Sequence, residues 1–339
     1  MAGDRQHYLP QFLQRGFSDS EGFVLMFRKD RPGRRVTTRN IGVERTFYTE
    51  QKDTRVDDAI TQAEAEFSRS ISTLRNSPAG PVDVSCLPEL FAHLEVRTRH
   101  LRQSFQQTSE SLHRKALSIL TDDQKLERML LAHIAKNPNK IDEMARHELH
   151  RLGLPESNSP MVVQEMTTRL SEFLQELSPE IHLASTNITS ALPETLRSSI
   201  KQAHNEALGR TIAPEIRVQS YKKLSFKTVD VLSANMILGD CGPIFHVERA
   251  KPFKTITENE DTILAAILPI TPTRVVVGAA GPYRLNAKDL RMGIARCSLE
   301  FFIAAENSGD NASLAKMIGL DAALLSDPEL DEILREASS

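Results

Sequence analysis

The sequence has no tryptophan, and its aromatic content is only 5%. This scarcity argues against a stacking platform for single-stranded nucleic acid, because such platforms depend on exposed aromatic rings. The three cysteines, Cys86, Cys241 and Cys297, are an odd number at wide spacings. They therefore predict neither a disulfide framework nor a Cys-x-x-Cys metal site, and we expect them to be structural thiols.

Long apolar runs and phosphate-binding glycine motifs are also missing. No run approaches the roughly 18 apolar residues of a membrane-spanning helix, and no apolar leader follows Met1. We therefore expect a cytoplasmic protein that does not contact a membrane. The lack of a Gly-rich phosphate cradle, a Gly-x-Ser-x-Gly elbow and a dinucleotide fingerprint disfavours ATP-driven, hydrolase-fold and NAD-dependent functions. No cofactor is predicted.

Charge is nearly balanced over the 339 residues, with a formal net charge of −3 and a hydrophobic content of 40%. This composition indicates one large or two modest globular domains and disfavours a surface built throughout for nucleic acid. Charge is nevertheless uneven, because residues 28–45 are rich in arginine and residues 321–336 are acidic. This asymmetry suits either intramolecular docking or solubility.

Periodicity predicts strands at both ends of the chain and helices between them. The run 23–28, the turn Arg31-Pro32-Gly33 and the run 34–38 indicate a β-hairpin. Apolar residues then recur at helical spacing from Val56 to Leu74, and a second helix is predicted from Leu87 through Leu101. Further amphipathic segments cover 109–136, 139–152, 160–177 and 193–208.

Short apolar runs return at 226–231, 236–238, 244–247, 263–268 and 274–278, which is typical of antiparallel strands. Helices are predicted from Asn286 to Asn307 and from Asp327 to Ala337. We therefore expect an α+β fold in which the N-terminal hairpin joins a C-terminal antiparallel sheet and a helical bundle is inserted between them. The expected segments are 1–54, 55–222, 223–310 and an acidic helical tail at 311–339, together forming one compact unit.

Several segments carry the resemblance to a known family. They are the opening His7-Tyr8-Leu9-Pro10 run and Phe17, the segment 44–48, Asp57 and Glu64, the arginine-containing helix 94–102, and the turn Gly239-Asp240-Cys241-Gly242-Pro243. The chain resembles the bacterial domain of unknown function 4238 family over most of its length. This resemblance implies an architecture and a few positions of interest, and it brings no established activity.

Four residues at those positions are the candidate catalytic groups: His7, Glu64, Arg97 and Asp240. Histidine titrates near neutral pH and is suited to proton transfer, and arginine can stabilise the developing charge of a phosphate. If the fold brings the four together, they suit metal-independent phosphodiester cleavage. The same residue types can equally form a buried ion-pair network that orients helices.

Two other motifs point to metal chemistry and fail on spacing. His147 and His150 are three residues apart, whereas a zinc-binding His-Glu-x-x-His helix needs four. The segment from Asp240 to Lys251 is similar to the acid-plus-lysine arrangement of magnesium nucleases, but it has two residues between Glu248 and Lys251 where one is usual. We therefore predict no metal site.

Two functions from different classes remain. The first is a nuclease-like or toxin-like effector that acts on RNA or a nucleotide, with His7 and an acidic residue transferring protons and Arg97 binding phosphate. The second is a non-catalytic module that binds a protein partner or ligand through the helical bundle. Convergence of the four residues in one cleft favours the enzyme, and their dispersal or burial as ion pairs favours the module.

Overall fold

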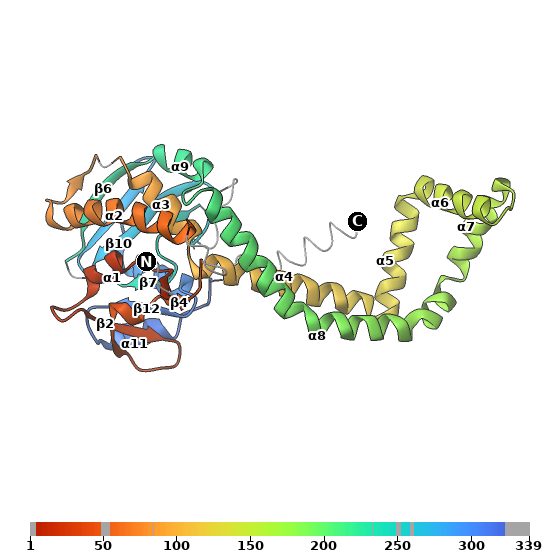
Figure 1. Cartoon of the computed structure of the whole chain (residues 1–339), viewed down its shortest axis with the longest axis horizontal. Coiled ribbons are helices and arrows are strands. Elements are labelled where there is room, and N and C mark those ends of the chain that lie inside the picture. The colour runs from red at the N-terminus through yellow and green to blue at the C-terminus, as the bar shows by residue number, and fades with distance from the viewer. Residues whose placement is uncertain are drawn as a thin grey trace. The chain divides into compact units, whose positions relative to one another are not determined.

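The computed structural model describes residues 5–48, 55–83, 85–232, 234–248, 252–257 and 261–322, apart from the side chains of residues 171, 188–191 and 193. These residues divide into two units (Figure 1). Unit 1 comprises the residues up to Phe105 together with those from Ile200 onward, and unit 2 comprises Gln106–Ser199. The division falls within two long helices, α4 (Arg99–Leu120) and α8 (Leu170–Arg210).

Unit 1 contains a six-stranded antiparallel sheet. Its strands lie in the order β5 (Gly80–Pro81), β6 (Ser225–Asp230), β11 (Arg274–Ala279), β10 (Ile263–Thr271), β8 (Ile244–Val247) and β9 (Phe253–Lys254). β10 and β11 form a hairpin in which Ala266 is opposite Gly278. A small separate ladder pairs β1 (Arg5–His7) with β4 (Val43–Arg45).

The central strand β10 is buried on both faces, which explains its nearly continuous apolar sequence. Alternate side chains of a strand point to opposite faces. Accordingly, Ala266 and Leu268 belong to one hydrophobic core and Ala265 and Ile267 to another. Helices α2 (Arg55–Asn76), α3 (Leu87–Val96) and α9 (Glu215–Lys222) contribute to the first core, and α10 (Ala287–Cys297) contributes to the second.

The N-terminal hairpin belongs to a second sheet of unit 1. Its order is β3 (Arg34–Thr37), β2 (Phe23–Arg28), β12 (Phe301–Ala304) and β7 (Leu238–Gly239). Phe27 of β2 is opposite Phe302 of β12, and their rings stack with centroids 5.2 Å apart. The fold is therefore α+β, as the sequence predicts.

The helix predicted from Asn286 to Asn307 is wrong in its second half. α10 ends at Cys297 because Ser298 adopts an extended backbone conformation. The carboxylate of Asp240 then accepts hydrogen bonds from the three backbone N–H groups at 299–301, and the apolar run from Phe301 continues as β12. The predicted terminal helix from Asp327 to Ala337 lies outside the described residues.

The helix predicted to run from Leu87 through Leu101 is also interrupted. α3 ends at Val96 and α4 begins at Arg99, so that Arg97 and Thr98 form the junction. Thr98 accepts the Leu101 N–H at 3.3 Å, which satisfies one free donor at the start of α4. This break is what positions Arg97.

Unit 2 is helical. Besides its parts of α4 and α8, it contains α5 (Asp123–Lys136), α6 (Pro138–Arg151), a short 3-10 turn at Glu156–Asn158, and α7 (Ser159–Thr168). The segments predicted at 160–177 and 193–208 are parts of α7 and of the single 41-residue helix α8. None of the helices in the described ranges combines the length and apolarity that a membrane span requires.

Short elements complete the described residues of unit 1. They are α1 (Gln11–Gln14), the 3-10 turns Arg15–Phe17 and Thr38–Asn40, and α11 (Gly309–Ala315). All three cysteines are buried thiols without a disulfide.

Candidate functional site

The loop after β1 is held in place by Gly42. This residue has a φ of +61°, and its carbonyl accepts the backbone N–H groups of Tyr8 and Leu9. A Cβ atom at position 42 would lie 2.7 Å from the Leu9 Cβ, so the approach of the two segments requires glycine. The pairing of His7 with Val43 in the ladder β1–β4 then places the His7 carbonyl within hydrogen-bond reach of Arg97, at the end of α3.

Arg97 is the centre of a buried hydrogen-bond network, and its side chain is only 2% exposed. Its Nε donates to the Tyr48 hydroxyl at 3.1 Å, and that hydroxyl donates to the Arg97 carbonyl at 3.0 Å. Nη1 pairs with the Glu64 carboxylate and lies 3.1 Å from the His93 Nε2, while Nη2 donates to the His7 carbonyl. Each guanidinium nitrogen therefore has a partner within the protein, as in an arginine that fixes neighbouring segments.

His7 contributes its backbone, rather than its imidazole, to that network. The His7 Nε2 lies 3.0 Å from the Gln11 Nε2. Burial lowers the pKa of His7 to about 4, and the charges of Arg97 and Arg5 act in the same direction. The imidazole is consequently neutral at pH 7, and a group with so low a pKa is a weak general base.

Asp240 is placed in a different arrangement. Its buried carboxylate accepts the N–H groups of Leu299 at 2.8 Å and of Glu300 at 2.7 Å, and more weakly that of Phe301 at 3.2 Å. Burial raises the pKa of Asp240 to about 6, against the effect of these hydrogen bonds. The structure thus joins His7, Glu64 and Arg97 through direct bonds, whereas Asp240 binds the turn between α10 and β12.

Arg102, in the first turn of α4, is also buried. Its Nη2 donates to the Phe47 carbonyl at 3.1 Å and to the Asn205 Oδ1 at 2.9 Å, and its Nε donates to His204 at 3.2 Å. The guanidinium carbon lies 3.9 Å from the centre of the Phe47 ring. Arg102 therefore ties the start of α4 to the end of α8 and to the segment that precedes α2.

The residues of the two metal-like motifs have other roles or lie outside the description. Glu148 pairs with Arg151, and Arg146 pairs with Asp142, all within α6. Lys251 lies outside the described residues. In the part of the chain that the structure describes, no group of three histidine, cysteine or acidic side chains could hold a metal ion.

Unit 2 has an unusual distribution of apolar side chains. Among the described residues, 14 large apolar side chains are exposed and 54 apolar residues are buried. Eight of the exposed side chains lie in unit 2, but only four of the buried residues do. The eight are Leu120, Met144, Leu152, Leu154, Met161, Met166, Phe173 and Leu183. The described part of unit 2 therefore exposes more large apolar side chains than the number of apolar residues it buries, and exposed apolar surface of this kind is typical of interaction sites.

A groove gathers two of these side chains at the junction of α7 and α8. We call it the α7–α8 groove; it has a volume of about 260 Å³ and is lined by Glu165, Met166, Arg169, Leu170, Glu172, Phe173 and Glu176. Met166 lies in α7, and Leu170 and Phe173 lie in the first turn of α8, so the apolar stripe that lines the groove crosses the junction of the two helices. Met166 is 59% exposed and Phe173 is 58% exposed.

The rim of the α7–α8 groove is acidic, because it carries three glutamates and one arginine. Arg169 is shared between two of them, with its Nε 3.0 Å from the Glu172 carboxylate and its Nη1 3.9 Å from that of Glu165. The sequence pattern does not predict this groove. Its apolar spacing is the same as that of a helix face packed in a core, so the pattern alone does not reveal that the stripe is exposed.

Taken together, these features define an α+β protein that carries a helical unit with an exposed apolar surface. The chain belongs to the family described as "Protein of unknown function (DUF4238)", which matches residues 5–289. No curated protein and no solved structure matches the chain significantly.

Proposed function

We propose that this chain is a non-catalytic binding protein and that the α7–α8 groove docks a basic amphipathic helix of a partner protein. The observation that carries the proposal is the concentration of exposed apolar side chains in unit 2, which holds eight of the 14 exposed ones and four of the 54 buried ones. Exposed patches of this kind commonly mark protein interaction sites.

Met166 and Phe173 supply the free energy for binding a partner. Each is more than half exposed, so a partner that covers them removes apolar surface from water. Covering the exposed part of one such side chain contributes about 1–2 kcal/mol. An amphipathic helix meets such a stripe with apolar residues at spacings of three and four, which is a common form of peptide recognition.

The charge of the rim selects the kind of helix. Three glutamates and a single arginine leave the rim net negative, and Arg169 is already shared between Glu165 and Glu172. Lysine or arginine residues beside the apolar face of a partner helix complement this charge, whereas glutamates there are repelled. The partner is therefore a basic helix.

The nuclease-like or toxin-like alternative needs His7, an acidic group and Arg97 to reach one RNA or nucleotide substrate. In its favour, His7, Glu64 and Arg97 lie together. Against it, the nitrogens of Arg97 are bonded to protein groups, and the Asp240 carboxylate is bonded to three backbone N–H groups. Phosphate binding by Arg97 would require those buried bonds to break, so the binding function is favoured.

The test uses a fluorescein-labelled 14-residue peptide of leucine and lysine, arranged as an amphipathic helix. A peptide with glutamate in place of each lysine has the same apolar pattern and the opposite charge. Both are titrated with the full chain, with Phe173→Ser and with Ile216→Ser, and binding is followed by fluorescence anisotropy. Ile216 is 68% exposed in α9 of unit 1, so its variant is a matched loss of exposed apolar surface elsewhere.

We expect the lysine peptide to bind the wild-type chain and Ile216→Ser alike, and Phe173→Ser about tenfold more weakly, which corresponds to about 1.4 kcal/mol. The glutamate peptide should not bind. Equal binding of both peptides, or an unchanged affinity of Phe173→Ser, would refute the proposal. Sedimentation velocity of the chain alone tests a different occupant: a dimer that Phe173→Ser dissociates would assign the groove to a second copy. Separately, RNA cleavage that His7→Ala abolishes would establish the enzyme.

A further inference from the structure

A group of cations lies at the turn between β2 and β3 in unit 1. We call residues 28–34 the hairpin tip; they hold four basic side chains and a single acidic one, that of Asp30. The basic residues are Arg28, Lys29, Arg31 and Arg34; the first is half-buried and the other three are exposed. Within the described ranges of the chain, none of these four forms an ion pair with an acidic side chain. Their charge is therefore available to a ligand.

The strand register places two of the arginines side by side. β2 and β3 pair antiparallel with Met26 opposite Arg34. Arg28 is two residues beyond Met26 on β2, and alternate residues of a strand lie on the same face. Arg28 and Arg34 are therefore diagonal neighbours, about 7–8 Å apart. The Arg31 N–H donates to the Arg28 carbonyl at 3.3 Å, which closes the turn and keeps its cations beside this pair.

The hairpin tip is fixed to the core of unit 1 at Gly33. A Cβ atom at this position would lie 2.7 Å from the ring of Phe27, so the backbone of the turn lies directly against that ring. Phe27 is fully buried and stacks on Phe302. Because the turn is already held in place, a ligand does not have to order its backbone, which reduces the entropic cost of binding.

Two sets of carboxylates near the hairpin already have arginine partners. Arg35, which follows the hairpin tip, pairs with Asp19 at 2.7 Å and with Glu21 at 2.6 Å. Glu300, which directly precedes β12, pairs with Arg99 at 3.0 Å. The hairpin tip therefore keeps a local excess of positive charge, although the net charge of the whole chain is −3.

Exposed cations of this kind favour a polyanion over a single small anion. Water and salt screen an exposed ion pair, so that it contributes little net free energy. A nucleic acid differs, because its phosphates carry condensed counterions that are released when basic side chains replace them. Three of the four cations are arginines, whose guanidinium groups match phosphate oxygens in geometry as well as in charge.

The composition of the hairpin tip favours duplex DNA among the nucleic acids. The tip has no aromatic ring on which an unpaired base could stack, and such rings are the usual basis of single-strand binding. Recognition of an RNA duplex uses its 2′-hydroxyl groups, and the tip has no hydroxyl or amide side chain to contact them.

We propose that the hairpin tip binds the phosphate backbone of duplex DNA. Contacts to phosphate carry no direct sequence information, so the binding does not depend on the base sequence. This site is separate from the α7–α8 groove, and neither proposal depends on the other.

The experiment titrates the full chain onto a short fluorescein-labelled DNA duplex at several salt concentrations and follows fluorescence anisotropy. An RNA duplex of the same sequence, the single DNA strand and labelled poly-glutamate are the other probes. The test variant combines Arg31→Gln with Arg34→Gln. A charge-conserving variant combines Arg31→Lys with Arg34→Lys.

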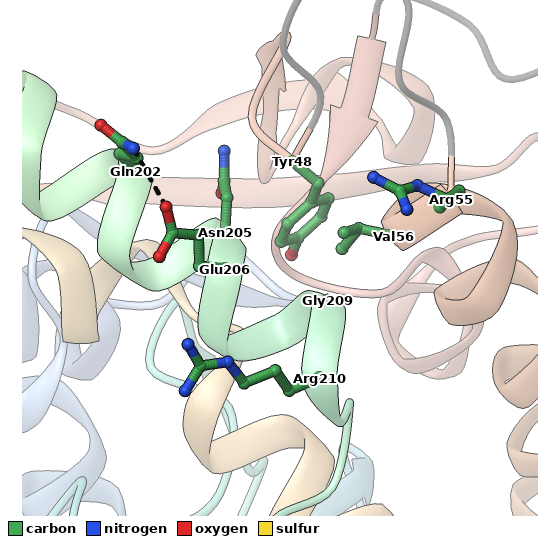
Figure 2. A pocket seen from close by; sticks show the side chains of 8 residues that line it. All are labelled: Tyr48, Arg55, Val56, Gln202, Asn205, Glu206, Gly209 and Arg210. Carbon is green, nitrogen blue, oxygen red and sulfur yellow. Dashed lines mark hydrogen bonds between the residues drawn. The ribbon is translucent and has the colours of Figure 1, made fainter.

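The matched control combines Arg210→Gln with Lys223→Gln, which removes two exposed positive charges elsewhere in unit 1. Figure 2 shows Arg210 on the last turn of α8, and Figure 1 shows α9, which Lys223 directly follows, at the opposite side of unit 1 from β2. Circular dichroism and sedimentation velocity establish that each variant keeps its fold and oligomeric state. The second check is needed because β3 is an edge strand, and charges on an edge strand also prevent association between strands.

We expect the logarithm of the dissociation constant for the DNA duplex to rise with the logarithm of the salt concentration with a slope of about 3–4, because each phosphate contact contributes about 0.9. The glutamine variant should lower this slope by about two and raise the dissociation constant at least tenfold. The lysine variant and the control should keep the slope of the wild type.

The proposal is overturned if the DNA duplex does not bind, or if the glutamine variant and the control lose affinity alike. A lysine variant with the reduced slope of the glutamine variant would also overturn it, because the charge is then not what binds. Tighter binding of the RNA duplex, the single strand or poly-glutamate than of the DNA duplex would overturn the assignment to duplex DNA.

Discussion

Replacing Arg97 by methionine tests whether the arginine network holds unit 1 together. Methionine keeps much of the side-chain volume but removes the groups that bond Tyr48, Glu64 and the His7 carbonyl. Removing one partner of a buried ion pair costs about 3–5 kcal/mol. Because the Glu64 side chain is 25% exposed and can recover some hydration, we expect the lower end, about 3 kcal/mol.

The assay is thermal unfolding followed by circular dichroism, with Glu64→Gln as the companion variant. A loss of about 3 kcal/mol lowers the Tm of a unit of this size by about 6–12 °C. Glu64→Gln keeps an acceptor oxygen for Arg97, so its Tm should fall by less than half as much. An Arg97→Met protein as stable as the wild type would refute the structural role, and would revive phosphate binding by Arg97.

Two further predictions concern stability. Burial lowers the pKa values of His7, His93, His100 and His204 to about 4, below the ordinary value of 6.5, so each of them binds a proton more readily when unfolded. Their contribution to the free energy of unfolding is therefore complete above pH 6.5 and is lost as the pH falls toward 4. Urea unfolding should show a lower free energy of unfolding at pH 5 than at pH 7.5. Equal values at the two pH values would contradict these pKa values. Gly42→Ala should destabilise unit 1 by about 1–2 kcal/mol, because alanine is strained at a φ of +61° and its Cβ would press on Leu9. Gly22 also has a positive φ, but no atom lies near a Cβ added there. Gly22→Ala in the same urea assay therefore separates the effect of backbone strain from that of the steric contact.

The sequence was sufficient for the fold class because the strongest signals are local. The apolar stripe from Val56 to Leu74 indicates a helix with one buried face, and Ile60, Phe67 and Ile71 are buried in the structure. β10 and β11 are readable as strands from their apolar runs and the turn between them. Such patterns depend only on the period of each element.

The end of α10 and the break between α3 and α4 could not be predicted from the sequence, because both depend on tertiary contacts. The run Phe301–Ala304 continues the apolar character of α10, and it becomes a strand because Asp240 holds the preceding turn and β2 pairs with it. The break at Arg97 likewise follows from the partners that its side chain finds on α2 and β1. Both contacts link residues far apart in the chain, which a local pattern does not contain.

The candidate residues illustrate the same division. Composition and resemblance identified His7, Glu64 and Arg97, and the structure places them together. Their residue types are equally suited to proton transfer and to a buried ion pair, and only the partners of each nitrogen distinguish the two. The α7–α8 groove could not be predicted from the sequence, because the exposure of Met166 and Phe173 depends on how the whole unit packs.

The most direct test of the binding function uses the absence of tryptophan. Phe173→Trp places the single indole of the chain in the α7–α8 groove, and Leu232→Trp places it at a 78% exposed position of unit 1. Indole emission moves to shorter wavelength when the ring leaves water. On titration with the leucine–lysine peptide, we expect a saturable blue shift for Phe173→Trp and none for Leu232→Trp. An emission spectrum of Phe173→Trp that stays constant at saturating peptide would contradict the binding function.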